Sequence, residues 1–339
     1  MKQKPLIIPV FVPHEGCRHR CVYCDQVTIS GVSQPFWSAT AVRRHIGSYF
    51  GRSSRHPVEV AFYGGSFTLL PRSRQLLLLE AVQDCLKRGQ INSVRISTRP
   101  DAIEADHLGF LRAMGVKTIE IGVQSLSDRV LSASARGHTS KHVYEAMLCL
   151  QQHGFEGGLQ LMPGLPSDSR DTFLRTVDQS IALRPNCVRL YPTIVLAGTQ
   201  LDRLYRRGRY EPLALAEAVE WCKEAKQRFA AAAIPVIRMG LQATASLEQP
   251  GHIVAGPYHP AFGQLVSSAI WRDRMTPLLK ETSRRSRRLV IHAQSQELAD
   301  IRGHRNGNLI DWVRELQLAS LKTVQCPQTG PGQFRITIE

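Results

Sequence analysis

The chain has 339 residues, of which 43% are hydrophobic, so it can bury a core larger than that of one typical domain. Its 43 Lys and Arg residues exceed its 28 Asp and Glu residues, and the net charge of +15 favours a polyanionic partner such as RNA, DNA, a membrane surface or an acidic small substrate. We expect a cytoplasmic protein, because no apolar run approaches the ~18–20 residues of a membrane span and the N-terminal stretch has no cleavable signal pattern.

β-rich and helical stretches alternate along the chain. Strands are expected at 7–12, 58–65, 94–99, 118–124, 158–164, 187–195 and 234–240. Helices are expected at 39–50, 72–88, 103–114, 140–153, 169–183 and 213–233. The strands read as apolar on both faces, which is typical of a parallel sheet covered by helices. The repeated order predicts an α/β fold, either a partial or full parallel (β/α) barrel or a doubly wound sheet.

The C-terminal part reads as a smaller unit. We expect a barrel domain over residues 1–244 and an α+β extension over 245–339, with a helix near 261–274 and a strand at RLVIHA, that caps the open side of the barrel and adds basic surface. Arginine dominates the charge, which favours phosphate recognition. The densest run, our candidate for RNA contacts, comprises Arg284, Arg285, Arg287 and Arg288. A second run comprises Arg203, Arg206, Arg207 and Arg209.

Three cysteines spaced Cys17-x3-Cys21-x2-Cys24 are the most specific motif. Three thiolates on one short loop can hold three corners of a [4Fe–4S] cluster and leave the fourth iron free for a substrate or cofactor. The alternatives are a zinc site that adds His14 or His19 and a chance grouping. Zinc sites usually bring two separated ligand pairs, and the other five cysteines are isolated, so the open cluster is favoured.

Polar groups and glycines follow successive strands, where parallel barrels keep their sites. Gly64 and Gly65 follow the second expected strand, and two glycines there allow the backbone to approach a ligand closely. Gln124 ends the fourth strand and Gln160 lies in the fifth. Each of these features alone is explained by turn or capping chemistry, but their repetition after a cysteine motif indicates one binding rim.

These motifs resemble those of the radical SAM superfamily, whose cysteine triplet is matched by Cys17, Cys21 and Cys24. Within this superfamily the chain resembles the radical SAM core of the Elongator catalytic subunit, which modifies tRNA wobble uridines, and its bacterial relatives without an acetyltransferase domain. The collinear stretches that carry this resemblance are PHEGCRHRCVYCDQ, AFYGGSFT, STRPD, EIGVQSLSDRVL, ARGHT, MPGLP, VRLYPTIVLAGTQL and AGPYHPAFGQLV.

The resemblance implies two cofactors, a [4Fe–4S] cluster on the three cysteines and S-adenosylmethionine (SAM). Tyr23 is the customary aromatic residue before the last cysteine. The other implied cofactor-binding residues are Gly64, Gly65, Ser66, Gln124, Arg136 and Gln160. A glutamate is common in relatives where Ser66 and Ser97 stand, so we expect neutral groups to replace its contacts. We also expect no acetyltransferase, methylthiotransferase or cobalamin domain.

The implied function is reductive cleavage of SAM to a 5′-deoxyadenosyl radical that modifies tRNA or another RNA. A one-electron donor such as flavodoxin or ferredoxin would be a partner, no membrane partner is expected, and the oligomeric state stays open. The alternatives are a radical SAM enzyme acting on a small, porphyrinogen-like anion, and a metal-containing RNA-binding or electron-transfer protein without enzyme activity. No substrate-side catalytic residue can be assigned, and Tyr191 and His259 are the candidates to examine.

Overall fold

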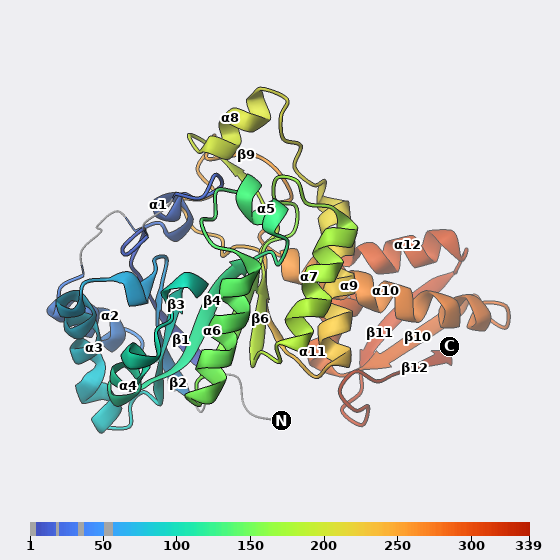
Figure 1. Ribbon diagram of the computed structural model, residues 1–339. Helices are drawn as coiled ribbons and strands as arrows, with labels where there is room; N and C mark the ends of the chain where they lie inside the picture. The colour runs from blue at the N-terminus through green and yellow to red at the C-terminus, as the bar shows by residue number, and fades with distance from the viewer. Residues whose placement is uncertain (1–4, 18–19, 33–36, 51–56) are drawn as a thin grey trace. The chain divides into compact units, whose positions relative to one another are not determined.

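The chain divides into two compact units. The structure is a computed structural model that describes residues 5–17, 20–32, 37–50 and 57–339 (Figure 1). The first unit comprises residues 1–215 and 225–258, and the second comprises 216–224 and 259–339. The expected division after residue 244 and the capping role of the extension stay predictions.

A seven-stranded parallel sheet forms the first unit. Its spatial order is β1-β2-β3-β4-β5-β6-β8, so neighbours in space are also neighbours in the chain apart from the excursion before β8. The strands are β1 Leu6–Phe11, β2 Val58–Tyr63, β3 Ser93–Thr98, β4 Val116–Gln124, β5 Glu156–Leu161, β6 Cys187–Leu190 and β8 Val236–Met239. Within the described residues β1 and β8 form the edges and do not pair. The expected α/β barrel is therefore confirmed in its partial, half-barrel form.

Helices follow the strands and pack on the sheet or on one another (Figure 1). They are α1 Gln26–Ser30, α2 Ala39–Gly47, α3 Arg72–Lys87, α4 Ala105–Ala113, α5 Asp128–Ala133, α6 Ser140–Gln152, α7 Arg170–Ala182, α8 Gln200–Arg206 and α9 Leu215–Ala231. The six expected helices agree with α2, α3, α4, α6, α7 and α9 to within a few residues at each end. The strand-facing side chains of these helices, such as Leu78 and Val143, are fully buried.

The expectation that the strands are apolar on both faces is wrong for the inner face. The outward residues are apolar, but Arg95, Glu120, Gln160 and Arg189 alternate with them and line a cavity inside the curled sheet. Successive strand residues point to opposite faces, so a sheet that encloses a hollow has one apolar face toward its helices and one polar face toward the hollow.

The expected strand at 187–195 is two strands. It breaks after β6, and β7 Val195–Leu196 pairs antiparallel with β9 Ile253–Ala255 in a separate two-stranded sheet. Pro192 lies at the break, where a proline cannot supply the amide donor that a central parallel strand needs. The break carries the chain out of the barrel sheet and into α8.

The second unit has its own apolar core. It contains α10 Phe262–Thr282, β10 Arg288–Ala293, α11 Ser295–Arg302, α12 Gly307–Glu315, β11 Ser320–Gln325 and β12 Phe334–Ile338. β10 is central, parallel to β11 and antiparallel to β12. Trp312, Met275, Leu279 and Ile291 are fully buried between helices and sheet. The expected strand RLVIHA coincides with β10, and the helix expected near 261–274 continues to Thr282.

None of the described helices combines the length and the apolar composition needed to cross a lipid bilayer.

Candidate metal and cofactor site

One cavity of about 870 Å³ lies inside the half-barrel, and its walls come from all seven strands and their following loops. Every residue that the sequence assigned to the metal or the cofactor lines it: Cys17, Cys21, Tyr23, Cys24, Gly64, Gly65, Ser66, Gln124, Arg136 and Gln160. These residues span 144 positions of sequence, and the parallel order of the strands brings their ends to the same rim. Tyr191, one of the substrate-side candidates, also lines the cavity.

The loop that carries the cysteines is held against the loop after β2. The amides of Val12, His14 and Ser66 donate to the carbonyls of Tyr63, Gly64 and Glu15 at 2.7, 3.0 and 2.9 Å. A side chain added at Gly65 would place its Cβ only 2.2 Å from the Glu15 carbonyl oxygen. Gly64 has φ +94°, a conformation that favours glycine. Both glycines are therefore needed for the two loops to pack, and their contact with the methionine ammonium of SAM stays a prediction.

A carboxylate clamp fixes the same loop from the other side. Both carboxylate oxygens of Glu15 accept from Arg74 on α3, at 2.8 Å each, and the two side chains are 11% and 13% exposed. Bidentate Arg–carboxylate pairs are the geometrically specific kind. Nη1 of Arg74 also donates to the Trp37 carbonyl at 2.6 Å. The segment that precedes Cys17 is thus tied to a helix of the barrel wall.

His14, which the zinc alternative required, already uses its ring nitrogen. Its Nε2 accepts a hydrogen bond from the Gln26 amide at 3.1 Å, so the lone pair that a metal would need points to the backbone. Burial, followed by the charge of Arg20, lowers the pKa of His14, which keeps the ring neutral and able to accept. His19, the other histidine of that alternative, lies outside the described residues.

Arg136 contacts the second cysteine directly. Its Nη1 donates to Cys21 Sγ at 3.1 Å and its Nη2 to the Gly122 carbonyl at 2.5 Å. Burial alone would lower the pKa of this guanidinium, but Tyr23 and Cys21 outweigh it and raise the pKa, so Arg136 stays charged. The expected role of Arg136 in SAM binding stays a prediction, and the contact observed is with a cluster ligand.

Cys21 is buried, Cys24 is partly buried and Cys17 is exposed, and two buried polar atoms beside them lack hydrogen-bond partners. Burial and then the charges of Cys21 and Cys17 raise the pKa of Cys24 to about 12. Tyr23 OH and Arg136 Nε are buried and have no partner among the described residues. Buried polar atoms normally have partners, so such orphans mark a place where a further group belongs. Ser66 Oγ lies 3.5 Å from Cys17 Sγ and is itself buried.

Gln124 and Gln160 meet at the ends of β4 and β5. Gln160 Nε2 donates to Gln124 Oε1 at 3.4 Å. Gln124 has φ +68°, a left-handed conformation that costs a non-glycine residue energy and is enriched at functional sites. The register between β4 and β5 shifts here. A Cβ at Gly122 would lie 2.7 Å from Arg136 Nη2 and 2.9 Å from Gln124 Nε2, so this glycine makes room for both side chains.

A charged network deeper in the same cavity was missed by sequence reasoning. Glu120 on β4 accepts from Arg95 at 2.8 Å and from Nε of Arg189 at 2.6 Å, and Arg95 also pairs with Glu59 at 2.7 Å. Arg189 Nη2 donates to Tyr63 OH at 2.5 Å. The signal that could have revealed this network is the alternation of side chains along each strand. A charged residue stands between apolar residues in VEVAFY, VRISTR, TIEIGVQ and VRLYP.

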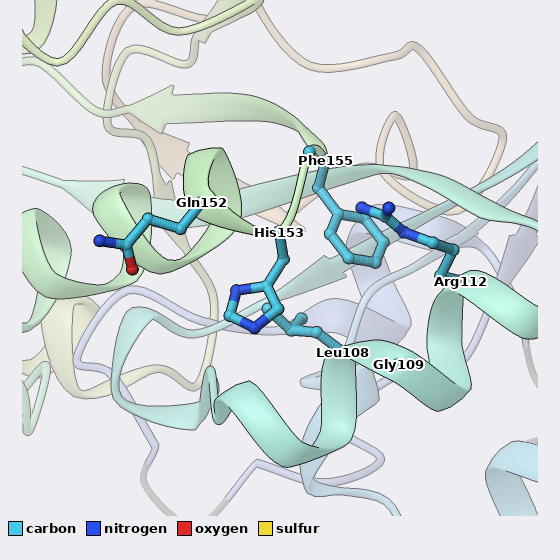
Figure 2. A pocket seen from close by; sticks show the side chains of 7 residues that line it. Leu108, Gly109, Arg112, Gln152, His153 and Phe155 are labelled. Atoms are coloured by element: carbon cyan, nitrogen blue, oxygen red, sulfur yellow. The ribbon is translucent and has the colours of Figure 1, made fainter.

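The remaining candidates lie in the second unit or away from the cavity. His259 belongs to the second unit, where its Nδ1 accepts from the Ala261 amide at 3.0 Å and its ring meets His304, so it closes a turn. The arginine run at 284–288 is exposed. A smaller hollow of about 430 Å³ lies between α4 and the turn that follows α6, and Arg112 stands 5.0 Å from the centre of the Phe155 ring there. Figure 2 shows the side chains that line it. This hollow shares no lining residue with the cysteine cavity.

The donor set fits an iron–sulfur cluster with a cofactor beside it. Three cysteine sulfurs share one cavity wall, a fixed guanidinium offsets their negative charge, and the cavity continues past them into polar walls. Within the described residues no three His, Cys, Asp or Glu side chains stand close enough together for one metal ion.

Comparisons with known proteins show the family of the chain. The family model of the radical SAM superfamily matches residues 11–179, and that of the radical SAM C-terminal domain matches 185–272. Elongator complex protein 3 of Mus musculus is 30% identical over 186 residues, which are 48% of this chain and 34% of that protein. The tRNA uridine(34) acetyltransferase of Methanocaldococcus jannaschii is 30% identical over 134 residues, 39% of this chain and 25% of that protein. The chain thus spans about a third of the first relative and a quarter of the second.

The chain is also similar to a heme chaperone and to a solved structure of an archaeal protein. Heme chaperone HemW of Mycobacterium tuberculosis is 28% identical over 225 residues, 61% of this chain and 57% of that protein. The archaeal Elp3 structure from Methanocaldococcus infernus superimposes with a TM-score of 0.62 at 22% identity, covering 81% of this chain and 64% of that one, and so supports the fold. The predicted resemblance is confirmed: the chain belongs to the radical SAM superfamily of enzymes.

Proposed function

We propose that the chain holds a [4Fe–4S] cluster on Cys17, Cys21 and Cys24, cleaves SAM reductively and uses the resulting radical to modify RNA, with tRNA as the substrate. The observation that carries this proposal is the single cavity lined by every predicted metal and cofactor residue. When bound, the cluster and SAM would together supply a 5′-deoxyadenosyl radical able to abstract hydrogen from a substrate.

The residues of the cavity would hold the cluster ligands and orient the cofactor. Arg136 holds the Cys21 sulfur through a charge-assisted hydrogen bond. Gln124 and Gln160 present amide groups to the cavity at the rim, where a ribose or a carboxylate would be recognised through neutral donors and acceptors. The network of Glu120, Arg95 and Arg189 lines the deeper part of the cavity with fixed charges that can orient a polar substrate.

Charge and similarity support RNA as the substrate. The net charge of +15 is dominated by arginine, which favours phosphate recognition. The two relatives with the highest identity reported above are an Elongator protein and a tRNA uridine(34) acetyltransferase. We propose additional phosphate contacts at the exposed run Arg284, Arg285, Arg287 and Arg288 of the second unit.

The rival function is radical chemistry on a small porphyrin-like anion. The similarity to a heme chaperone covers more of this chain than the Elongator similarity does. The cavity also holds Arg238, whose Nε donates to the Gly240 carbonyl at 3.2 Å. A buried polycarboxylate could pair with such a cation, so the experiment must separate the two substrates.

The test is an anaerobic assay with mass spectrometry. The cluster is reconstituted and reduced with dithionite, SAM is added, and 5′-deoxyadenosine is measured alone, with unfractionated tRNA and with coproporphyrinogen III. Product stimulated by tRNA and a mass change in tRNA nucleosides would support the proposal. Stimulation by the porphyrinogen alone would transfer the assignment to the rival. No product from a preparation with four irons per chain would refute radical SAM activity, and Cys21→Ser serves as the negative control.

A further inference from the structure

We propose that the segment Arg203–Tyr210, the end of α8 and the turn after it, is an RNA docking surface. This inference rests on the proposed function and deepens it by locating the contact with the RNA backbone. The segment reads RLYRRGRY, in which arginines alternate with two tyrosines, and we call it the α8 basic segment. In Figure 1 α8 lies at the same end of the first unit as α1 and α5, which flank the cysteine loop and the β4 rim.

Three cations of this segment are available. Arg203, Arg207 and Arg209 are exposed, and no side-chain partner is recorded for them among the described residues. Arg206 instead pairs with Asp202 at 2.7 Å. Arg203 and Arg207 are four residues apart at the end of the helix, so they lie on the same side of it. Free guanidiniums on one side of a helix suit successive phosphates, because each can donate two parallel hydrogen bonds.

An aromatic side chain accompanies these cations. Tyr205 is 37% exposed, so its ring is accessible to a binding partner. Aromatic rings between arginines are typical of surfaces that bind single-stranded nucleic acid, because any base can stack on the ring while its backbone meets the cations. Glu211 is the nearest exposed acid along the chain, and Asp202 is neutralised by Arg206.

Apolar packing fixes the segment beside the cysteine loop. The Leu201 amide donates to the Val22 carbonyl at 2.7 Å, one residue from Cys21. Val22 and Leu201 are buried together, with Tyr23, Leu204 and Tyr210 packed against them. Tyr210 OH donates to the Gly164 carbonyl at 2.6 Å. The apolar side of the segment therefore holds the cluster loop, and its charged side stays exposed.

The position of the α8 basic segment favours a macromolecular partner over a small anion. Within the described residues, the lining of the cysteine cavity includes no residue from Arg203 to Tyr210. A small anion inside this cavity would therefore not contact the α8 basic segment. An RNA whose reacting nucleotide enters the cavity has its neighbouring phosphates outside. Cations fixed to the cluster loop lie where such phosphates would be held.

Matched triple variants test the surface. Arg203→Gln, Arg207→Gln and Arg209→Gln are combined, and the control combines Arg43→Gln, Arg44→Gln and Arg88→Gln, which are exposed on α2 and at the end of α3 and remove the same charge. Binding of unfractionated tRNA to the anaerobic, cluster-loaded protein is measured by fluorescence anisotropy from 50 to 300 mM KCl. Circular dichroism and iron content check that each variant is folded and loaded.

We expect the α8 triple variant to raise the Kd for tRNA by about tenfold or more near 100 mM salt. The slope of log K against log salt should become less steep by about two to three, close to one for each lost phosphate contact. The control changes both by much less. Tyr205→Ala weakens binding by about tenfold and Tyr205→Phe restores it, because stacking needs the ring and not the hydroxyl.

The outcomes separate this inference from the proposed function. If the wild-type protein binds tRNA and the α8 triple variant binds equally well with the same salt slope, the docking surface is wrong and the proposed function stands. If the α8 and control triples lose affinity equally, net charge and not this surface is responsible, which also overturns the inference. If the wild-type protein binds no tRNA, the RNA substrate itself is refuted.

Discussion

Replacing Arg136 with glutamine removes the guanidinium that donates to the Cys21 sulfur at 3.1 Å, and with it both the positive charge and this hydrogen bond. A reduced cluster carries one more electron than an oxidised one. A fixed cation beside a ligand sulfur therefore stabilises the reduced form, and hydrogen bonds to the sulfurs act in the same direction. We expect the midpoint potential of the cluster to fall in the variant, which makes its reduction harder.

The magnitude follows from Coulomb's law. Two unit charges 4 Å apart attract by about 4 kcal/mol at an effective dielectric constant near 20. Spreading the added electron over the whole cluster halves this to about 2 kcal/mol, or about 90 mV for a one-electron couple. Arg136 is buried, so screening by salt is weak and the shift should persist at moderate ionic strength.

The assay is a redox titration followed by electron paramagnetic resonance, with iron and sulfide content measured on the same samples. Arg136→Lys keeps the charge and is the matched control, with an expected shift much smaller than that of Arg136→Gln. A fully loaded Arg136→Gln protein whose potential stays within about 20 mV of the parent would refute the electrostatic reasoning. A shift that appears only after SAM is added would assign Arg136 to SAM binding instead.

The remaining predictions concern the metal, the interior network and the loop clamp. Cys21→Ser removes a ligand, so reconstituted protein should hold well under four irons and form no 5′-deoxyadenosine; retention of both would contradict the cluster assignment. Glu120→Gln removes the buried negative charge that pairs with Arg95 and Arg189, so the free energy of unfolding should fall by about 3 kcal/mol in thermal denaturation. An unchanged midpoint would mean that water compensates for the lost charge. Glu15→Gln weakens the clamp to Arg74, so unfolding should cost about 2 kcal/mol less and a chelator should remove iron faster; the exposed Glu80→Gln is the control, and equal rates in the two variants would count against the clamp.

The cluster motif and the order of elements were predictable from the sequence because both are local. The spacing of Cys17, Cys21 and Cys24 lies within eight residues, and the alternation of strands and helices follows from short-range apolar periodicity. The rim residues Gln124 and Gln160 were also predictable, because parallel strands must bring their carboxyl ends together. Element boundaries agreed to within a few residues except where the expected strand 187–195 is interrupted at Pro192 and where the helix expected near 261–274 continues to Thr282.

Only the tertiary structure decided which side chains meet inside the sheet. Arg136 reaches Cys21 across 115 positions, and Glu120 joins Arg95 and Arg189 from three strands. Alternation along a strand indicates which side chains share a face, but which of them meet depends on the pairing of distant strands and on how far the sheet curls. The choice between a half-barrel and a closed barrel was likewise a matter of pairing between the two edge strands. The proposed cluster ligands lie within eight consecutive residues, whereas the charged walls of the cavity form only when distant strands pair and the sheet curls.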